Sequence, residues 1–366
     1  MTQKKSERKK SLAINSYGVV VLVLVLVAGA AAGAGCTSPE NSPVTIPSTT
    51  MVTTVPGPAT EVARTPALSI PLRRIIVTNA NAAELLMAIG AEDSIVGISD
   101  TVKTHPVLGP RFSQVPSIGN WQTPDVETIL SLHPDAVISY ASYQPKNIDK
   151  LTSANITILP IDCYKIDTLV SDARKLGNLT GKESSAEEYV EFVESGETLV
   201  RSRLGTMVGE DLPRVYFESY SDYSTLTGGT GADSLVTMAG GENIAGLLPV
   251  SSPKVNAEWL VAQNPDIIVK VVASTKKDLD FKEVRSALEN RDGIRNTSAV
   301  KNNQVYVISN DIVYGPRAVI GLLYFAEILN PDKFSDLDPK KMLDEYAGRF
   351  APGTNTTEMM YPAKAA

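Results

Sequence analysis

The chain has 366 residues, of which 43% are hydrophobic, and a formal net charge of −7 at pH 7. This length allows about two domains with their own cores, and the mildly acidic charge argues against a nucleic-acid partner. Two Cys are too few for a disulfide framework, and two His are too few for a site built from several imidazole ligands.

The N-terminal segment has the pattern of an export signal or a membrane anchor. A basic start is followed by a stretch without charge from Ser11 to Pro39. Cys36 follows small residues and resembles a lipoprotein processing site, although Gly33 stands where a larger aliphatic residue is usual. Lipidation of Cys36 and a retained signal anchor are both open, and either would tether the protein to the outer face of a membrane. We therefore expect residues 1–36 to be the signal or anchor, and the Pro-, Thr- and Ser-rich residues 37–70 to form an extended stalk.

From residue 71 onward, short β-branched runs alternate with helical patterns, which is typical of parallel sheets covered by helices. In the first lobe, residues 71–183, Asn81 is expected to cap a helix, with Glu84 at the capping-box position. The second lobe, residues 208–350, repeats the plan, and the tail 351–366 is expected to fray. Strands are predicted at 74–77, 95–98, 136–139, 157–159, 215–218, 267–272 and 304–308, with further helices at 147–154, 234–239, 281–291 and 317–329 and one beginning at 338–339.

One long helix is predicted between the lobes, at residues 184–207. Ser184 and Glu187 have the spacing of a capping box. Apolar residues follow at nearly helical spacing, at Tyr189, Val190, Val193, Leu199, Val200 and Leu204. A helix as the sole crossing resists bending, so we expect little movement between the lobes.

One motif occurs in both lobes. Residues 125–139 are predicted to form a short helix, a tight turn and a buried strand, and residues 256–271 repeat this pattern. In both copies a Glu, at position 127 or 258, precedes a Pro-Asp pair by seven residues. Pro ends the helix and Asp favours the turn. A second repeat matches 85–95 with 235–244, so the two lobes are predicted to share one fold.

With both repeats, the chain resembles the helical-backbone substrate-binding proteins of ABC importers, which serve iron-siderophore, haem and cobalamin uptake. The resemblance covers about Leu72 to Phe334 and rests on five segments in order: 74–100, 118–139, 230–246, 255–269 and 302–311. It implies an α/β fold of two Rossmann-like lobes with parallel sheets, joined by one long helix, with a ligand cleft between them. It also implies a monomer without enzymatic activity or cofactor, which delivers a metal chelate to an ABC permease dimer. A ferric siderophore-type complex is the expected chelate, with haem or a corrinoid as alternatives.

Two acidic residues match the family's docking positions. In such proteins an acidic residue on each lobe binds a basic pocket of the permease, and by motif these residues are Glu127 and Glu258. Two distant carboxylates on one face would fix both position and orientation on a basic partner. The local alternative is that the helix dipole favours a Glu in the first turn, and a duplicated fold would preserve its spacing.

The candidate ligand-binding residues follow the predicted strands, because ligands bind outside the carboxyl ends of the strands in open parallel sheets. Tyr has a flat apolar face and a polar tip, which suits a large flat or chelated ligand. Arg317 is expected to pair with an anionic oxygen of that ligand, or alternatively with Asp311. The alternative for each Tyr is an ordinary half-buried residue. The candidates are Trp121, Tyr140, Tyr143, Tyr164, Tyr220, Tyr223, Tyr314 and Arg317.

No metal site is predicted from the protein's own side chains, because the shortage of His favours a metal that arrives in its own chelator. His105 and His133 each precede a Pro and are interpreted as turn residues, and Cys163 as a structural residue. Two other function classes remain open: a surface sensor or adhesion lipoprotein, and an enzyme on the same scaffold. The sequence contains no GxSxG, HExxH, CxxC or dinucleotide fingerprint, which disfavours the enzyme.

Overall fold

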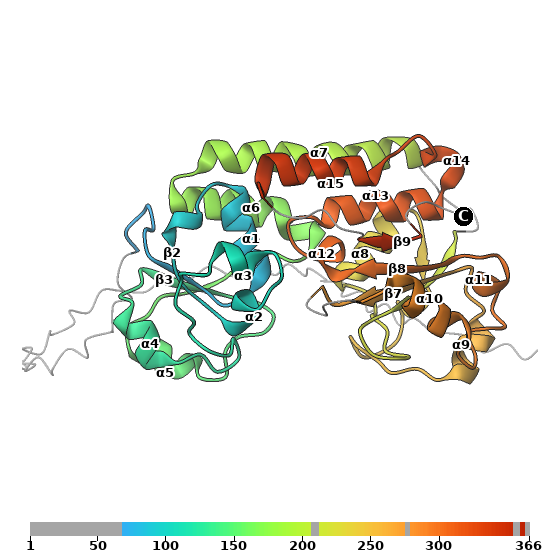
Figure 1. Ribbon diagram of the computed structural model, residues 1–366, viewed down its shortest axis with the longest axis horizontal. Coiled ribbons are helices and arrows are strands. Elements are labelled where there is room, and N and C mark those ends of the chain that lie inside the picture. The colour runs from blue at the N-terminus through green and yellow to red at the C-terminus, as the bar shows by residue number, and fades with distance from the viewer. Residues whose placement is uncertain (1–67, 206–211, 275–278, 354–358, 363–366) are drawn as a thin grey trace, which may run out of the picture. The chain divides into compact units, whose positions relative to one another are not determined.

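The computed structural model describes residues 68–205, 212–274, 279–353 and 359–362. These residues form two α/β lobes joined by the long helix α7, Glu183–Leu204 (Figure 1). Both lobes belong to one compact unit, residues 61–366. The predicted signal, Cys36 and nearly all of the predicted stalk lie outside the described residues. Within the described ranges, no helix is both long and apolar enough to cross a membrane.

The first lobe contains a parallel sheet, and its described strands have the order β2-β1-β3-β4. Their bounds are Ile75–Val77 (β1), Ile95–Ile98 (β2), Ala136–Ser139 (β3) and Ile158–Pro160 (β4). The Ile and Val runs of β1 and β3 are fully buried because helices cover both faces of the sheet, whereas the edge strand β4 is partly exposed. The covering helices are Ala80–Ala88 (α1), Asp100–Lys103 (α2), Leu108–Arg111 (α3), Val126–Ser131 (α4), Ile148–Ser153 (α5) and Ile166–Thr180 (α6), with a 3-10 turn at Glu92–Ser94.

The second lobe repeats this strand order and adds an edge strand. Its described strands have the order β6-β5-β7-β8-β9, and β9 alone among them is antiparallel to its neighbour. The strands are Arg214–Glu218 (β5), Glu242–Asn243 (β6), Ile267–Val272 (β7), Val305–Ser309 (β8) and Met360–Tyr361 (β9). The helices are Gly231–Met238 (α8), Ala257–Gln263 (α9), Phe281–Glu289 (α10), Ser298–Lys301 (α11), Asn310–Val313 (α12), Ala318–Leu329 (α13), Pro331–Phe334 (α14) and Pro339–Phe350 (α15). The predicted two-lobe α/β fold is confirmed.

The repeated Pro-Asp motif has the same structural role in both lobes. Asp135 accepts a hydrogen bond from the backbone N–H of Arg74 at 2.8 Å, and Asp266 accepts one from Arg214 at 2.9 Å. The side chain of Arg74 donates to the backbone at the C-terminal end of α4, and the side chain of Arg214 donates to the backbone at the C-terminal end of α9. The Asp therefore fixes the start of a central strand, and the Arg fixes the helix that carries the motif's Glu.

The second repeat ends its helix with glycine in both copies. Gly90 after α1 and Gly240 after α8 have φ angles of 68° and 79°, in the left-handed region that glycine enters at low cost. The following residues, Ala91 and Gly241, donate backbone hydrogen bonds to Leu86 and Val236. These turns direct the chain from each helix into the edge strands β2 and β6.

Some details of the helices differ from the prediction. Asn79, not Asn81, caps α1, since its side chain accepts a hydrogen bond from the N–H of Ala82. The predicted capping box at Ser184 is absent, because α7 begins at Glu183 with Lys182 at its N-cap, so that Ser184 lies inside the helix. The carboxylate of Glu187 pairs with Arg174 of α6. Helix α6 itself was not predicted.

The long helix α7 is not the only link between the lobes. Helix α15, the last described helix of the chain, runs beside α7 (Figure 1) and packs on it through Phe192, Tyr346 and Phe350. It also contacts α1 of the first lobe. The Tyr346 hydroxyl donates to Glu84 of α1 at 2.8 Å. Helix α7 carries the chain between the lobes, as predicted, and α15 adds further packing between them.

Candidate functional site

A cavity of about 610 Å³ lies between the lobes and is lined by residues from both. Its size is within the range of small-ligand sites. It lies at the carboxyl ends of the strands in both sheets, where ligands bind in open parallel folds. The first lobe contributes Ala80, Asn81, Glu84, His105, Trp121, Tyr140, Ser142, Tyr143, Tyr164 and Lys165. The second contributes Ser219, Tyr220, Leu226, Gly228, Gly229, Thr230, Gly231, Ser251, Ser252, Asn310, Asp311 and Tyr314.

Four of the lining aromatic rings form a ladder that crosses from the first lobe to the second. Trp121 meets Tyr140 with ring centroids 5.4 Å apart, and Tyr140 meets Tyr164 at 6.0 Å. Tyr164 then meets Tyr314 of the second lobe at 6.2 Å. All three contacts are edge-to-face, an arrangement that aromatic quadrupoles favour. The ladder gives the cavity a continuous apolar wall whose ends belong to different lobes.

The remaining two lining Tyr lie nearer solvent. Tyr143 is 60% exposed and Tyr220 is 49% exposed. Burial, with a smaller contribution from the charge of Asp311, raises the pKa of Tyr220 to about 12. Burial also raises the pKa of Tyr140 and of Tyr314. The phenols of Tyr140, Tyr220 and Tyr314 are therefore neutral at physiological pH, which suits stacking and hydrogen bonding better than direct coordination of a metal.

Tyr223 lies outside the cavity, in contrast to its predicted place in the ligand site. Its φ of 60° turns the chain in the left-handed region, and its hydroxyl donates to the carbonyl of Asp292 at 2.6 Å. The guanidinium of Arg291 covers its ring at 5.1 Å. The side chain is thus held against the body of the second lobe and does not line the cavity.

Arg317 is also placed differently from the prediction, because it is buried behind the cavity with an exposure of 4%. Its guanidinium donates twice to Glu84 of the first lobe, at 2.7 and 2.9 Å. Its second neighbour is Asp311, at 3.7 Å, so the alternative partner considered for it is present. An internal carboxylate occupies the position expected for a ligand anion.

Asp311 connects this buried group to His105. The imidazole Nε2 of His105 lies 3.6 Å from Asp311, while its Nδ1 accepts from the N–H of Leu108. Burial alone would raise the pKa of Asp311, but the charge of Arg317 and the bond from His105 outweigh it and lower that pKa to about 2. His105 is therefore more than a turn residue. It lines the cavity and contacts the opposite lobe, which the His-Pro pattern did not reveal.

A second buried charge cluster holds the loop that carries Tyr220. Glu218, at the end of β5, is fully buried and pairs with Lys270 at 2.9 Å and Arg291 at 2.7 Å. Arg291 also pairs with Asp222 in the loop at 2.9 Å, and Lys270 donates to the carbonyl of Ser219 at 2.7 Å. The loop is therefore fixed at both ends by charge-assisted bonds. Sequence reasoning missed this cluster because its members are far apart in the chain.

The predicted docking residues are exposed on the two lobes. Glu127 and Glu258 each occupy the second position of a short helix, α4 or α9, capped by Asp125 or Asn256. Figure 1 shows α4 and α9 at the ends of their lobes that lie away from α7. Among the described residues, neither Glu carboxylate has an ion pair or hydrogen bond. Their position on one side, outside the cavity, is compatible with docking, and their role stays a prediction.

A groove of about 660 Å³ lies beside Glu127, between α4 and α5. Its other lining residues include Leu130, Asn147 and Lys150. The exposed carboxylate of Glu127 therefore stands at the edge of a depression, where a partner side chain has room to approach.

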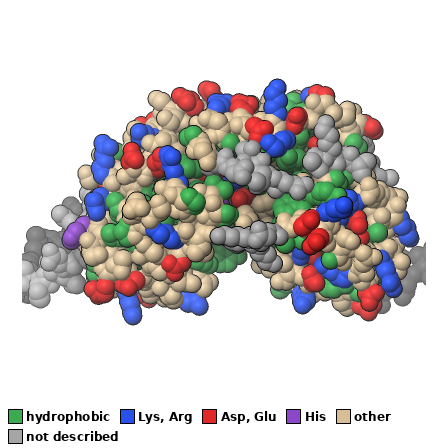
Figure 2. Space-filling model, in the orientation of Figure 1, with side chains coloured by type: hydrophobic (Ala, Val, Ile, Leu, Met, Phe, Trp, Pro, Cys, Tyr) green, Lys and Arg blue, Asp and Glu red, His purple; other side chains and the backbone are tan. Residues whose placement is uncertain are grey.

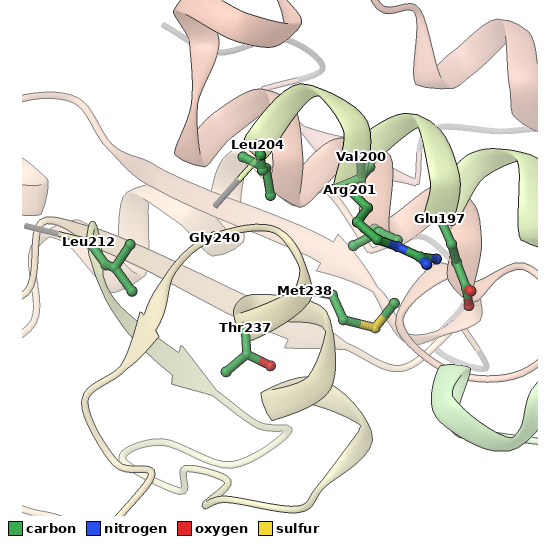
Figure 3. A pocket seen from close by; sticks show the side chains of 10 residues that line it. Glu197, Val200, Arg201, Leu204, Leu212, Thr237, Met238 and Gly240 are labelled. Carbon is green, nitrogen blue, oxygen red and sulfur yellow. The ribbon is translucent and has the colours of Figure 1, made fainter. Parts of the chain in front are cut away.

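A second, smaller cavity of about 300 Å³ lies at the C-terminal end of α7 (Figure 3). It is lined by Glu197 and Arg201 of α7 and by Met238 and Thr237 of α8, among others, and shares no lining residue with the cavity between the lobes.

The visible face of the molecule carries acidic and basic side chains interspersed with one another (Figure 2). In the described part of the chain, no group of three or more His, Cys, Asp or Glu side chains could hold a metal ion.

Comparison with known proteins identifies the family. Residues 75–312, well over half of the chain, match the family described as periplasmic binding protein. The chain belongs to this family. A Bacillus subtilis relative, named as an uncharacterized ABC transporter substrate-binding lipoprotein, is 26% identical over 272 residues, which cover 72% of this chain and 82% of the relative.

Two further relatives have names that include a ligand. A cobalamin-binding protein of Halobacterium salinarum is 26% identical over 247 residues, covering 66% of this chain and 65% of the relative. A vitamin B12-binding protein of Yersinia pestis is 28% identical over 210 residues, covering 57% of this chain and 71% of the relative.

Solved structures share the fold of this periplasmic binding protein. The TroA-like protein FepB of Veillonella parvula superposes with a TM-score of 0.68 at 22% identity, covering 82% of this chain and 97% of that one. The molybdate-bound MolA of Haemophilus influenzae also gives 0.68, at 21% identity and 79% and 95% coverage. The vitamin B12-binding BtuF of Vibrio cholerae gives 0.59, at 21% identity and 71% and 98% coverage. At these identities the likeness concerns the fold alone.

The protein is therefore an extracytoplasmic substrate-binding protein of an ABC transporter and not an enzyme. Its partners are a small-molecule ligand and the transporter's permease. The cavity between the lobes is the candidate site for this ligand.

Proposed function

We propose that this binding protein captures a large metal chelate in the cavity between its lobes, and that the chelate is a corrinoid of the cobalamin type. The observation that carries the proposal is the aromatic ladder from Trp121 to Tyr314, which spans both lobes. A flat, largely apolar ring system can lie against such a wall, with polar groups reaching the Ser and Asn side chains around it.

The choice of corrinoid is supported by the names of the relatives from Halobacterium salinarum and Yersinia pestis. The second candidate is the ferric siderophore-type chelate expected from the sequence. It is supported by the sequence resemblance to binding proteins that serve iron-siderophore uptake. In both cases the metal arrives inside its chelator, in agreement with neutral lining phenols. A corrinoid would fill the cavity and project past the rim formed by Tyr143 and Tyr220.

Calorimetric titration of the purified protein with cyanocobalamin, haemin, a ferric catecholate and a ferric hydroxamate tests the ligand class. Cyanocobalamin should bind, and Tyr314→Ala should weaken it by roughly threefold to tenfold, from a lost aromatic contact of about 0.5–1.5 kcal/mol. Tyr361→Ala is the matched control, since Tyr361 lies on β9 and does not line the cavity. Binding of a ferric chelate alone would select the second candidate. Binding of none of the four would refute the proposal.

We further propose that Glu127 and Glu258 dock the protein onto basic pockets of the permease. Both side chains are exposed, and their helices lie at the same side of the two lobes (Figure 1). Charge reversal of both to Lys should abolish ligand-dependent stimulation of transporter ATPase activity in proteoliposomes, because like charges would then face each other. Ligand affinity should be unchanged.

The control for docking reverses two exposed glutamates on α7, Glu188 and Glu191. This double variant changes the net charge equally on the opposite side of the molecule. It should stimulate the transporter like the wild type. Equal losses in both double variants would mean that net charge matters and not the two proposed positions.

The membrane tether remains a proposal carried by the sequence around Cys36. The lipoprotein name of the Bacillus subtilis relative supports it. Intact-mass measurement of the protein from its own host should find an acyl modification at Cys36, whereas an unmodified N-terminal segment would favour a retained signal anchor.

A further inference from the structure

The charged side chains that line the cavity are not equally neutralised. Its two carboxylates, Glu84 and Asp311, both lie beside Arg317, and Asp311 also contacts His105. Lys165, in contrast, has no acidic partner within 4.0 Å among the described residues. The cavity therefore presents ligand with one cation whose charge the described protein does not balance.

The position of Lys165 is set by contacts with both lobes. The residue follows β4 and directly precedes α6 of the first lobe. Its ammonium lies 5.7 Å from the ring centroid of Tyr164, within the range of a cation–π contact. Its Cγ would lie 3.7 Å from a Cβ built at Gly231 in the second lobe. The half-buried side chain thus runs along the aromatic ladder and ends in the cavity.

We infer that Lys165 determines ligand specificity by binding an anionic oxygen group, a carboxylate or a phosphate, on the periphery of the chelate. This inference rests on the proposed function and adds the chemical class of the ligand. A charge that is partly removed from water gains most from an opposite charge at short range, since the effective dielectric constant is lower there. The ring system of the chelate would lie against the aromatic ladder, and its anionic group would reach the ammonium of Lys165 beside Tyr164.

For a corrinoid, the anionic group is the phosphodiester that links the ring to its nucleotide. Cobinamide lacks this group and keeps the ring. For a porphyrin, the anionic groups are two carboxylates, which the dimethyl ester removes. Comparing affinities within each pair of ligands separates the contribution of the anionic group from that of the flat ring.

The test is a calorimetric cycle with cyanocobalamin, dicyanocobinamide, haemin and haemin dimethyl ester against wild type, Lys165→Met and Lys165→Arg. Lys165→Met should weaken the anionic member of a bound pair by about tenfold to a hundredfold, the range for a charge-assisted hydrogen bond. It should leave the affinity for the member that lacks the anionic group nearly unchanged, and Lys165→Arg should retain most of the affinity. Lys301→Met, at an exposed site outside the cavity, is the matched control.

Ionic strength gives an independent readout. Wild-type affinity for the anionic member should fall as salt rises, and this dependence should be smaller in Lys165→Met. An equal loss for both members of a pair, or no loss for either, would overturn the inference while leaving the chelate function intact. If the wild type binds no member of either pair, the corrinoid and porphyrin assignments fail, and the inference about Lys165 fails with them.

Discussion

Replacing Arg317 with Met should destabilise the protein strongly, because it leaves a buried carboxylate without its cation. Arg317 is 4% exposed and Glu84 is 5% exposed, and two hydrogen bonds of 2.7 and 2.9 Å join them across the lobes. Removing one member of such a pair costs about 3–5 kcal/mol. In a protein of this size, that loss corresponds to a fall in melting temperature on the order of 10 °C.

Urea unfolding followed by tryptophan fluorescence measures this change in the free energy of unfolding. Arg174→Met is the matched control, because Arg174 forms an exposed ion pair with Glu187, and such pairs contribute little. The double variant Glu84→Gln with Arg317→Met should lose less than the sum of its two single changes, since the amide carries no charge to bury. A loss below about 1 kcal/mol for Arg317→Met, or one equal to that of the control, would refute the reasoning.

Three further predictions concern other residues. The pKa of Asp311 is lowered from its usual 3.8 to about 2, so its contribution to stability of roughly 2 kcal/mol is present above pH 4 and is lost as pH falls toward 2. The midpoint of urea unfolding should therefore depend less on pH across this range in Asp311→Asn than in the wild type. Arg291→Met should loosen the loop that carries Tyr220, so we expect faster hydrogen exchange in this loop and several-fold weaker ligand binding. Unchanged exchange rates and affinity would contradict this prediction. Gly240→Ala should lower the free energy of unfolding by about 1 kcal/mol, because φ at this position is 79°. Gly348→Ala, inside α15 and with open space around it, should raise the free energy of unfolding by about 0.5–1 kcal/mol. Equal shifts in melting temperature for the two variants would contradict this contrast.

The sheets could be predicted because their signals are local. Each central strand is a short run of β-branched residues ended by turn residues, and the same order occurs twice, so strand bounds agree with the prediction to within about one residue. The repeated Glu and Pro-Asp motif also located α4 and α9. Helix α6 also has a local signal in the sequence, since its buried residues Ile166, Leu169, Ala173 and Leu176 fall at helical spacing.

The site could be predicted only in part, because strand ends indicate which residues are near the cavity but not which way each side chain points. Eight ligand-binding residues were proposed, all in the described part of the chain, and six of them line the cavity. Arg317 and Tyr223 do not, since each has a protein partner distant in sequence, Glu84 and Asp292. The contact of His105 with the opposite lobe likewise depends on long-range packing.

A crystal structure of the protein with bound cyanocobalamin tests the central claim most directly. We expect the corrin ring against the rings of Trp121 and Tyr140 from one lobe and Tyr314 from the other, with the phosphodiester near Lys165. A ligand bound in the cavity at the end of α7, or on one lobe only with the ladder uncovered, would contradict the account.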